Sequence, residues 1–271
     1  MQAIETHGFK IPLIGLGTWV LRGRDCTRVV TQAIRIGYRY IDTAQMYDNE
    51  AAVGEGVRTS GLRSEVIVCT KVAPERLAPH DLERSVKESL SRLRLDAIDV
   101  LLIHWPNPRV PLAETLGAMA KLKHDGYVKQ IGVSNFTVAL VEEAVKATTE
   151  PLVCNQIECH PYLNQDKVIA ACRKAGMAVV AYSPIARGSA KGDELLERIG
   201  KAYGKSAAQV CLRWLTQQDI AVIPRTSKVE RLQENFALFD FHLSDAEMKE
   251  IATLARNDGR LVDWSWSPKW D

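Results

Sequence analysis

Four residues capable of acid–base chemistry stand near the points where short apolar runs give way to polar sequence: Asp42, Tyr47, Lys71 and His104. The runs are rich in β-branched and aliphatic residues, as buried strands are, and they cover residues 38–44, 66–71 and 98–105. Titratable residues at the carboxyl ends of successive parallel strands are typical of an enzyme built on a (β/α)8 barrel. The pattern therefore predicts a catalyst.

The types of these residues suggest proton transfer. Lys71 needs an anion at the end of its strand, and Asp42 closes the neighbouring run. Such a buried pair can also serve only to join two strands. Tyr47 favours a catalytic role, because a phenol with an ordinary pKa of about 10 becomes a usable acid where a nearby ammonium stabilises its phenolate. His104 can then present a ring nitrogen to the same substrate oxygen.

The elements that must position these residues alternate along the chain. Helix-like segments such as 80–93 carry apolar residues at i, i+3, i+4 and i+7, and Gly37, Gly126 and Gly176 provide stops before the next strand. Eight strand–helix cycles with no break in composition predict one α/β domain over residues 1–271, a (β/α)8 TIM barrel. An open doubly wound sheet shows the same alternation, but its site gathers at one switch point, whereas here polar residues follow nearly all the runs.

The later helices carry capping-box sequences, in which a serine precedes a glutamate or glutamine by three residues: Ser206 with Gln209, Ser227 with Glu230, and Ser244 with Glu247. We expect two helices beyond the eightfold count, at about 206–217 and 244–255, and a short C-terminal tail over 257–271. The first helix is expected from about Cys26 to Ile36.

The bulk composition restricts the partners. The 271 residues include 35 basic and 33 acidic side chains, a net charge of +2 without a basic stripe or an acidic tail, so we expect neither nucleic acid nor membrane as a partner. The first residues lack the pattern of a signal peptide. The six scattered cysteines form no C-x-x-C pair and are expected to be buried thiols. A cytoplasmic monomer that binds a small molecule and no metal is the expectation.

Eight motifs, in order along the whole chain, resemble those of the aldo-keto reductase superfamily: GLGTW (15–19), YRYIDTAQMYDNE (38–50), VCTK (68–71), LLIHWP (101–106), GVSNF (132–136), NQIECHPY (155–162), AYSPI (181–185) and IPRTSKVERLQENF (223–236). The compact length is most similar to the bacterial branch that includes 2,5-diketo-D-gluconic acid reductases. The resemblance implies a barrel that binds NADPH in extended form, and GLGT indeed lacks the third glycine of a dinucleotide fingerprint.

The resemblance also implies a reaction and a catalytic tetrad of Asp42, Tyr47, Lys71 and His104. Hydride passes from NADPH to the carbonyl carbon of an aldehyde or ketone, and Tyr47 protonates the oxygen. Lys71 and Asp42 tune that phenol, and His104 orients the carbonyl. Small or sugar-derived carbonyls such as methylglyoxal or 2,5-diketo-D-gluconate are the expected substrates.

The remaining implied contacts with the cofactor fall at strand ends and loops. Ser134, Asn135 and Gln156 are expected to bind the nicotinamide amide, with Tyr182 stacked on the ring. Gly17, Thr18 and Asp42 are expected as further contacts with the cofactor. Ser183, Pro184, Ile185 and Arg187 are expected to meet the pyrophosphate. The segment 223–236 favours an anion at a helix start: Arg225, Thr226, Ser227 and Arg231 suit the 2′-phosphate, Glu234 and Asn235 the adenine, and Lys228 a further contact. Arg225 stands where the family commonly has lysine, which leaves the strength of the preference for NADPH over NADH open.

The substrate cleft is expected to be lined by Trp19, Tyr47, His104 and Trp105. Trp264, Trp266 and Trp270 of the tail either pin the tail to the barrel or wall the pocket, because one aromatic can do both. Two other functions have the same fold: a nucleotide-binding barrel that acts as a sensor or regulatory subunit, and a metal-dependent hydrolase. The second lacks the histidine pair or carboxylate cluster that such a metal site uses.

Overall fold

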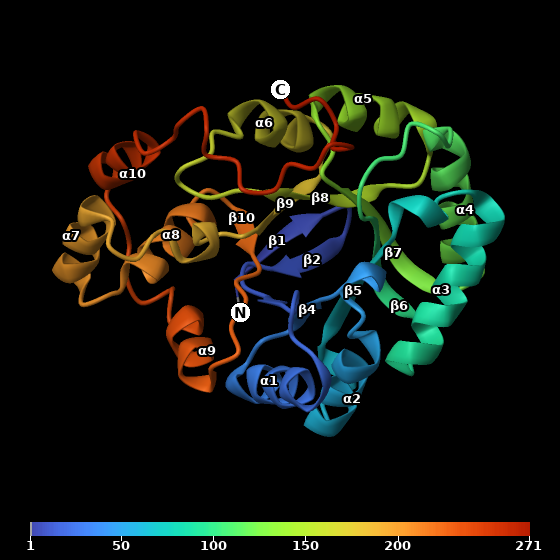
Figure 1. Cartoon of the computed structure of the whole chain (residues 1–271), viewed down its shortest axis with the longest axis horizontal. Helices are drawn as coiled ribbons and strands as arrows, with labels where there is room; N and C mark the ends of the chain where they lie inside the picture. The colour runs from blue at the N-terminus through green and yellow to red at the C-terminus, as the bar shows by residue number, and fades with distance from the viewer. Residues whose placement is uncertain (1) are drawn as a thin grey trace.

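The computed structural model describes residues 2–271; Met1, the first residue of the predicted domain, lies outside them. Eight parallel strands follow one another in chain order around the molecule (Figure 1): β3 (Leu16–Gly17), β4 (Tyr40–Asp42), β5 (Ile67–Val72), β6 (Ile98–Ile103), β7 (Val128–Ser134), β8 (Leu152–Glu158), β9 (Ala178–Tyr182) and β10 (Ile220–Val222). Ile14 pairs with Val222 in parallel, and the Gly15 N–H donates to the Val222 carbonyl at 2.9 Å. The first and last strands therefore meet, and the predicted (β/α)8 barrel is confirmed.

Within the described residues, ten helices pack around the strands: α1 (Gly23–Ile36), α2 (Glu50–Ser60), α3 (Pro79–Leu93), α4 (Leu112–His124), α5 (Val138–Ala147), α6 (Asp166–Lys174), α7 (Glu194–Tyr203), α8 (Ala207–Thr216), α9 (Val229–Phe236) and α10 (Asp245–Ala252). The periodic positions of α3, such as Leu82, Val86 and Leu93, are buried against the barrel, as their spacing predicts. Burial of this stripe is the main force that holds each helix in place.

Two helices are additional to the barrel, but one of them differs from the expectation. Leu212 and Leu215 of α8 pack into the main core with Ile220 and Val222 of β10, so α8 is a barrel helix. The additional helix before β10 is instead α7, which lies farther out beside α10 in Figure 1. Spacing along the sequence could not distinguish the two, because both helices have an apolar stripe.

The capping boxes are confirmed at Ser206 and Ser244, whose side chains accept from the N–H groups of Gln209 and Glu247. The box predicted at Ser227 is wrong. Helix α9 begins at Val229 after Lys228, which makes no side-chain cap, and the Lys228 N–H donates to the Thr226 hydroxyl at 3.0 Å. The start of α1 at Gly23, rather than Cys26, is a smaller difference.

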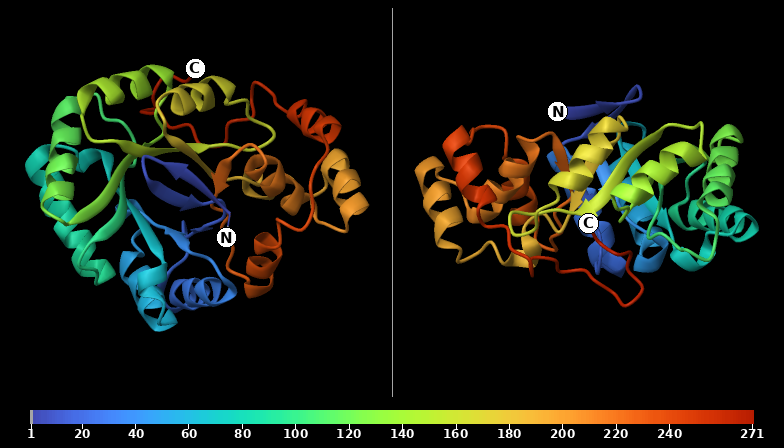
Figure 2. Two further views of the ribbon diagram at one scale, coloured as in Figure 1. Left: turned by 180° about the vertical axis from the view of Figure 1, so that it is seen from behind. Right: turned by 90° about the horizontal axis from the view of Figure 1, so that it is seen from above.

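An antiparallel hairpin that the sequence analysis did not predict closes the amino-terminal end of the barrel. It consists of β1 (Ala3–Thr6) and β2 (Phe9–Pro12), with His7 and Gly8 at positive φ in the turn. The Thr6 hydroxyl donates to the carbonyls of Val153 and Gly176, which fixes the hairpin beneath the strands. Figure 2 shows it on the side opposite the C-terminal tail, so the carboxyl ends of the strands are left open on the tail side.

The interior is apolar on both sides of the strands. Tyr40, Cys69, Leu102, Cys154 and Val180 fill the barrel, and a second, larger cluster lies between the strands and the helices. All six cysteines are free and buried, as expected. Over residues 2–271 we find no helix with the length and apolar character required to cross a bilayer.

Candidate active site

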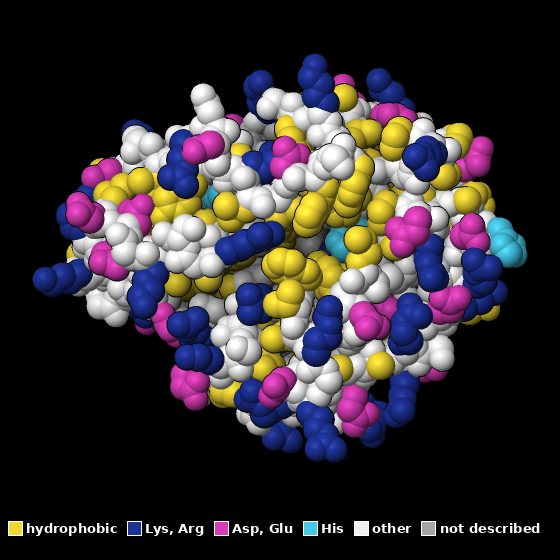
Figure 3. Space-filling view, in the orientation of Figure 1, with side chains coloured by type: hydrophobic (Ala, Val, Ile, Leu, Met, Phe, Trp, Pro, Cys, Tyr) yellow, Lys and Arg dark blue, Asp and Glu magenta, His cyan; other side chains and the backbone are white. Residues whose placement is uncertain are grey.

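A cavity of about 350 Å³ opens at the carboxyl ends of the strands. Figure 3, drawn in the orientation of Figure 1, shows a hollow near the middle of this face that is bordered largely by hydrophobic side chains. The predicted residues that line it are Gly17, Trp19, Asp42, Tyr47, His104, Trp105, Ser134, Asn135, Gln156, Tyr182, Ser183, Pro184, Ile185, Arg187, Arg225, Thr226, Ser227 and Arg231. Residues from seven of the eight strand ends or the loops after them thus converge, as they must at this face of a barrel.

Lys71 and Asp42 form a buried ion pair beneath the cavity. The Lys71 ammonium lies 2.7 Å from each carboxylate oxygen of Asp42 and 2.8 Å from the Thr43 carbonyl oxygen, and both charged side chains are essentially inaccessible. Burial alone would lower the pKa of Lys71, but the Asp42 carboxylate, together with the weaker influences of Tyr47 and Cys69, raises it above the ordinary value. The amine therefore carries a positive charge at neutral pH.

Tyr47 stands over this pair at the end of a short 3-10 turn, Gln45–Tyr47. The Gln45 side chain fixes the turn, since it donates to Ser85 and accepts from the Ala73 N–H. The Lys71 ammonium lies 3.4 Å from the Tyr47 hydroxyl. Burial raises the pKa of Tyr47 and Lys71 lowers it, with a net value of about 12. The expected acidification by the ammonium is thus outweighed by burial, and the phenol keeps its proton at neutral pH.

His104 follows β6 and packs edge-on against Tyr47, with ring centroids 5.5 Å apart. Burial, and after it the charge of Lys71, lowers the pKa of His104 well below its usual value. The imidazole is therefore neutral and carries one N–H. Its buried Nδ1 has no hydrogen-bond partner among residues 2–271. Tyr47 and His104 thus both line the cavity and are both uncharged at neutral pH.

The amides of the neighbouring strands form a hydrogen-bonded network around the pair. The Gln156 amide donates to Asp42 Oδ2 at 2.7 Å, which ties β8 to β4 across the barrel. The Asn135 amide donates to the His104 carbonyl and accepts from the Tyr182 hydroxyl at 2.8 Å. Ser134 donates to the Gln156 carbonyl. These side chains have fixed positions, so they can orient a planar group that enters the cavity.

The segment before and at the start of α9 provides positive charge at one end of the cavity. Arg225, Ser227, Lys228 and Arg231 are exposed and line it, while Thr226 is buried in the turn. The Arg28 guanidinium of α1 donates to the Ser227 carbonyl at 3.3 Å, so a further positive charge lies beside this segment. An anion at this helix start would meet both free N–H groups and arginine side chains.

Three of the predicted cofactor residues lie outside the cavity wall. Thr18 is buried and donates to the Asp42 carbonyl at 2.8 Å, so it supports the strand ends. Glu234 accepts from the Ser206 hydroxyl on α8, and Asn235 is buried in α9. Their contacts with a cofactor stay predictions.

The loop after β9, the strand that pairs with β10, also borders the cavity. Ser183, Ala186 and Arg187 all have positive φ, which bends the loop tightly over the strand end. The Arg187 guanidinium lies 5.0 Å from the centre of the Trp19 ring, in a cation–π contact that joins this loop to the one after β3.

The C-terminal tail supplies cavity residues that the sequence analysis did not assign or left undecided. Val262 and Trp264 line the cavity, as do Met46, Gly188 and Ile223. Trp266 and Trp270 instead pack on Trp105, with ring centroids 5.2 and 6.1 Å away. Both roles considered for the tryptophans are therefore present. Met46 could have been found from its place next to Tyr47, but no motif marks Val262.

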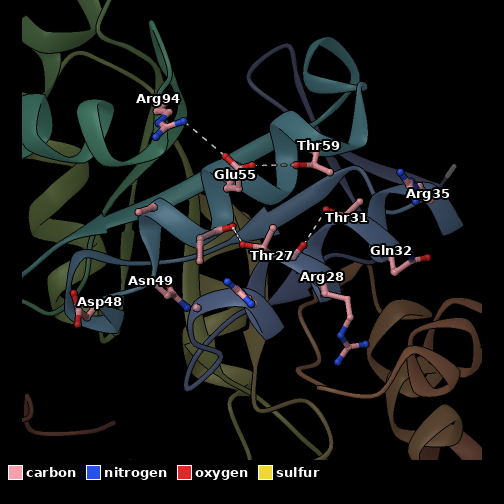
Figure 4. A pocket seen from close by; sticks show the side chains of 14 residues that line it. Thr27, Arg28, Thr31, Gln32, Arg35, Asp48, Asn49, Glu55, Thr59 and Arg94 are labelled. Atoms are coloured by element: carbon pink, nitrogen blue, oxygen red, sulfur yellow. Dashed lines mark hydrogen bonds and ion pairs between the residues drawn. The ribbon is translucent and has the colours of Figure 1, made fainter.

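A larger groove of about 800 Å³ lies on the surface between α1 and α2 and contains none of the predicted site residues (Figure 4). In it Glu55 pairs with Arg94 and accepts from Thr59, and the tetrad residues Asp42, Tyr47, Lys71 and His104 are all absent from its wall. We therefore place the chemistry in the smaller cavity. Within the described part of the chain, no three His, Cys, Asp or Glu side chains converge as metal ligands would.

Comparisons with known proteins agree with this geometry. The family model described as the aldo/keto reductase family matches residues 13–256. The chain is 40% identical over 265 residues to a methylglyoxal reductase of Escherichia coli O157:H7, covering 96% of this chain and 99% of that protein. It is also 40% identical over 261 residues to a glyoxal reductase of Bacillus subtilis strain 168, covering 95% and 94%.

Two solved structures are similar throughout. One, provisionally assigned as a 2,5-diketo-D-gluconic acid reductase B, has a TM-score of 0.98 at 44% identity and covers 100% of this chain and 98% of its own. The other is a Bombyx mori aldo-keto reductase in complex with NADP, with a TM-score of 0.91 at 32% identity, covering 97% and 95%.

Proposed function

Because this chain belongs to the aldo/keto reductase family, we propose that it reduces aldehydes and ketones to alcohols at the expense of NADPH. The observation that carries the proposal is the position of Tyr47. Its protonated hydroxyl lines the cavity and lies 3.4 Å from the charged amine of Lys71, which in turn contacts Asp42. A proton donor and a stabilising cation thus stand together where a carbonyl oxygen would be bound.

The donor set of the cavity fits a nicotinamide dinucleotide phosphate. Asn135, Gln156 and Ser134 offer amide and hydroxyl groups for the carboxamide, and Tyr182 offers an aromatic face. Arg225, Lys228 and Arg231 offer cations for the 2′-phosphate, and the loop from Ser183 to Arg187 would hold the pyrophosphate. When bound, the reduced nicotinamide supplies the hydride that is added to the carbonyl carbon.

The residues of the chain bind the carbonyl and deliver the proton. The neutral His104 ring donates its N–H to the carbonyl oxygen and orients it toward Tyr47. As negative charge develops on that oxygen, the Tyr47 hydroxyl gives up its proton to it. The Lys71 ammonium stabilises the resulting phenolate, and Asp42 with Gln156 holds the amine in place.

We further propose small dicarbonyls, methylglyoxal above all, as substrates, with sugar-derived carbonyls such as 2,5-diketo-D-gluconate as the next class. The size of the cavity and the activities named for the relatives support this choice. We also propose that residues 1–271 work as one domain and as a cytoplasmic monomer. The six buried free thiols support a reducing compartment.

The test is NADPH consumption by the purified protein across a panel of carbonyls. We expect turnover with methylglyoxal and glyoxal that is absent without a carbonyl. If the protein binds NADPH tightly but none of the carbonyls in the panel causes NADPH to be consumed, the chain is a nucleotide-binding sensor or regulatory subunit instead.

A further inference from the structure

One buried carboxylate fixes the C-terminal tail to the barrel. Glu158, the last residue of β8, is fully buried, and its oxygens accept from the N–H groups of Leu261 at 2.6 Å and Val262 at 2.8 Å. His160 lies 2.9 Å away through Nε2, which must carry the ring proton because a carboxylate can only accept. The strand that presents Gln156 to the cavity therefore also holds the tail.

The path of the tail backbone before Leu261 is also sterically restricted. Gly259 passes so close to the barrel that an added Cβ would lie 1.8 Å from the Tyr162 carbonyl oxygen. The Arg256 N–H donates to that same oxygen at 3.1 Å. The chain can therefore reach Glu158 along this path only with glycine at position 259.

The anchored segment forms part of the cavity wall. Val262, held by its own N–H, and Trp264, two residues later, both line the cavity that contains Tyr47 and His104. Trp266 then packs edge-on against Trp105, which lines the cavity too. In Figure 2 the tail runs along the side of the molecule opposite the N-terminal hairpin, which is the side of the strand carboxyl ends.

Building on the proposed reductase function, we infer that Glu158 is a specificity-determining positioning residue. By holding two consecutive N–H groups, it sets the distance between the tail wall and the catalytic side chains. Hydrogen bonds to a buried carboxylate are strong, so the wall has one position and a bulky carbonyl must displace it. A glutamine at 158 would turn its NH2 toward an N–H donor and leave a buried group unpaired, which releases the tail.

Three variants test this inference. Glu158→Gln removes the charged acceptor, Gly259→Ala blocks the path while keeping the carboxylate, and Trp264→Ala shortens an exposed part of the wall with little risk to folding. Glu250→Gln on α10, an exposed carboxylate paired with Arg198, is the matched control. The readout is kcat and KM for methylglyoxal and for the bulky 1-naphthaldehyde.

We expect each of the three variants to lower the preference for methylglyoxal over 1-naphthaldehyde by about tenfold. The change should come from a higher KM for methylglyoxal at nearly constant kcat, with NADPH affinity and the control unchanged. An equal loss of kcat for both aldehydes, or an unchanged preference in Gly259→Ala and Trp264→Ala, would overturn the inference. Those two variants decide the matter if Glu158→Gln does not fold.

The rate of trypsin cleavage after Lys269 tests this inference independently of the proposed function, because the measurement does not require enzymatic turnover. A released tail should be cut faster in Glu158→Gln and Gly259→Ala than in the wild type or the control. Equal rates would reject the anchor even in an active enzyme. A wild type that reduces no carbonyl would reject the proposed function, and the cleavage rates would still judge the anchor.

Discussion

At the scale of single residues, burial governs the pKa values of Tyr47 and His104, the two groups that we propose as donors to the carbonyl oxygen. It raises the pKa of Tyr47 to about 12 and lowers that of His104, so both are neutral at neutral pH. The charges of Lys71 and Asp42 behind them compensate each other at 2.7 Å. In the reaction that we propose, a carbonyl would therefore meet two neutral donors, and the Lys71 ammonium would stabilise the negative charge that develops.

The lowered pKa of His104 has a consequence for stability. In the unfolded chain this histidine titrates near 6.5, whereas in the folded protein it resists protonation. The unfolded state thus binds more protons below about pH 6.5, so the free energy of unfolding should fall as the pH drops from about 7.5 to about 5. Urea unfolding at both pH values should show a smaller decrease in His104→Gln than in the wild type. The same decrease in both proteins would mean that His104 is not the group responsible.

At the scale of elements, one end of the cavity depends on the turn before α9. Arg225 and Arg231 lie on either side of the helix start, and Thr226 holds the turn through the Lys228 N–H. A phosphate bound here gains the arginine charges and the free N–H groups of the first helical turn.

Arg225→Ala should weaken NADPH binding by about tenfold, since a charge-assisted hydrogen bond to the 2′-phosphate is lost. NADH lacks that phosphate and should bind nearly as before. Dissociation constants from the quenching of tryptophan fluorescence measure both. The control is Arg24→Ala, which changes an exposed arginine of α1 that lines the groove between α1 and α2, and it should change neither value. Equal losses for NADPH and NADH in Arg225→Ala would reject the phosphate assignment.

The elements differ in how far the sequence predicts them. Apolar runs that end in Asp42, Lys71 and His104 could be predicted as strands, because their burial and their polar ends are local properties. The tail could not, since its course depends on contacts with Glu158 about a hundred residues earlier. The box at Ser227 failed for a local reason: the Thr226 hydroxyl accepts the Lys228 N–H, and the helix begins later than the motif indicates.

At the scale of the whole molecule, the two ends of the barrel have separate tasks. The hairpin β1–β2 seals one end through Thr6, and the tail borders the cavity at the other. Between them the strands and helices approach closely, and glycine permits some of these approaches. A Cβ on Gly54 of α2 would lie 2.1 Å from the Leu93 carbonyl oxygen at the end of α3.

Gly54→Ala should therefore lower the free energy of unfolding by about 1–3 kcal/mol, because backbone must shift to admit the methyl group. Gly117 in α4 has open space around it, and Gly117→Ala should instead raise it by about 0.5–1 kcal/mol. Urea unfolding of both variants gives the comparison. A stabilising or neutral Gly54→Ala would show that α2 and α3 pack less closely than described.

The most direct test of the account is the turnover of Tyr47→Phe, because the central claim is that this phenol delivers the proton. The change removes only the hydroxyl that lies 3.4 Å from the Lys71 ammonium and should leave the NADPH site unaltered. We predict that kcat for methylglyoxal falls by at least about 10²-fold while the dissociation constant of NADPH stays within about twofold. Turnover at the wild-type rate with intact NADPH binding would contradict the account.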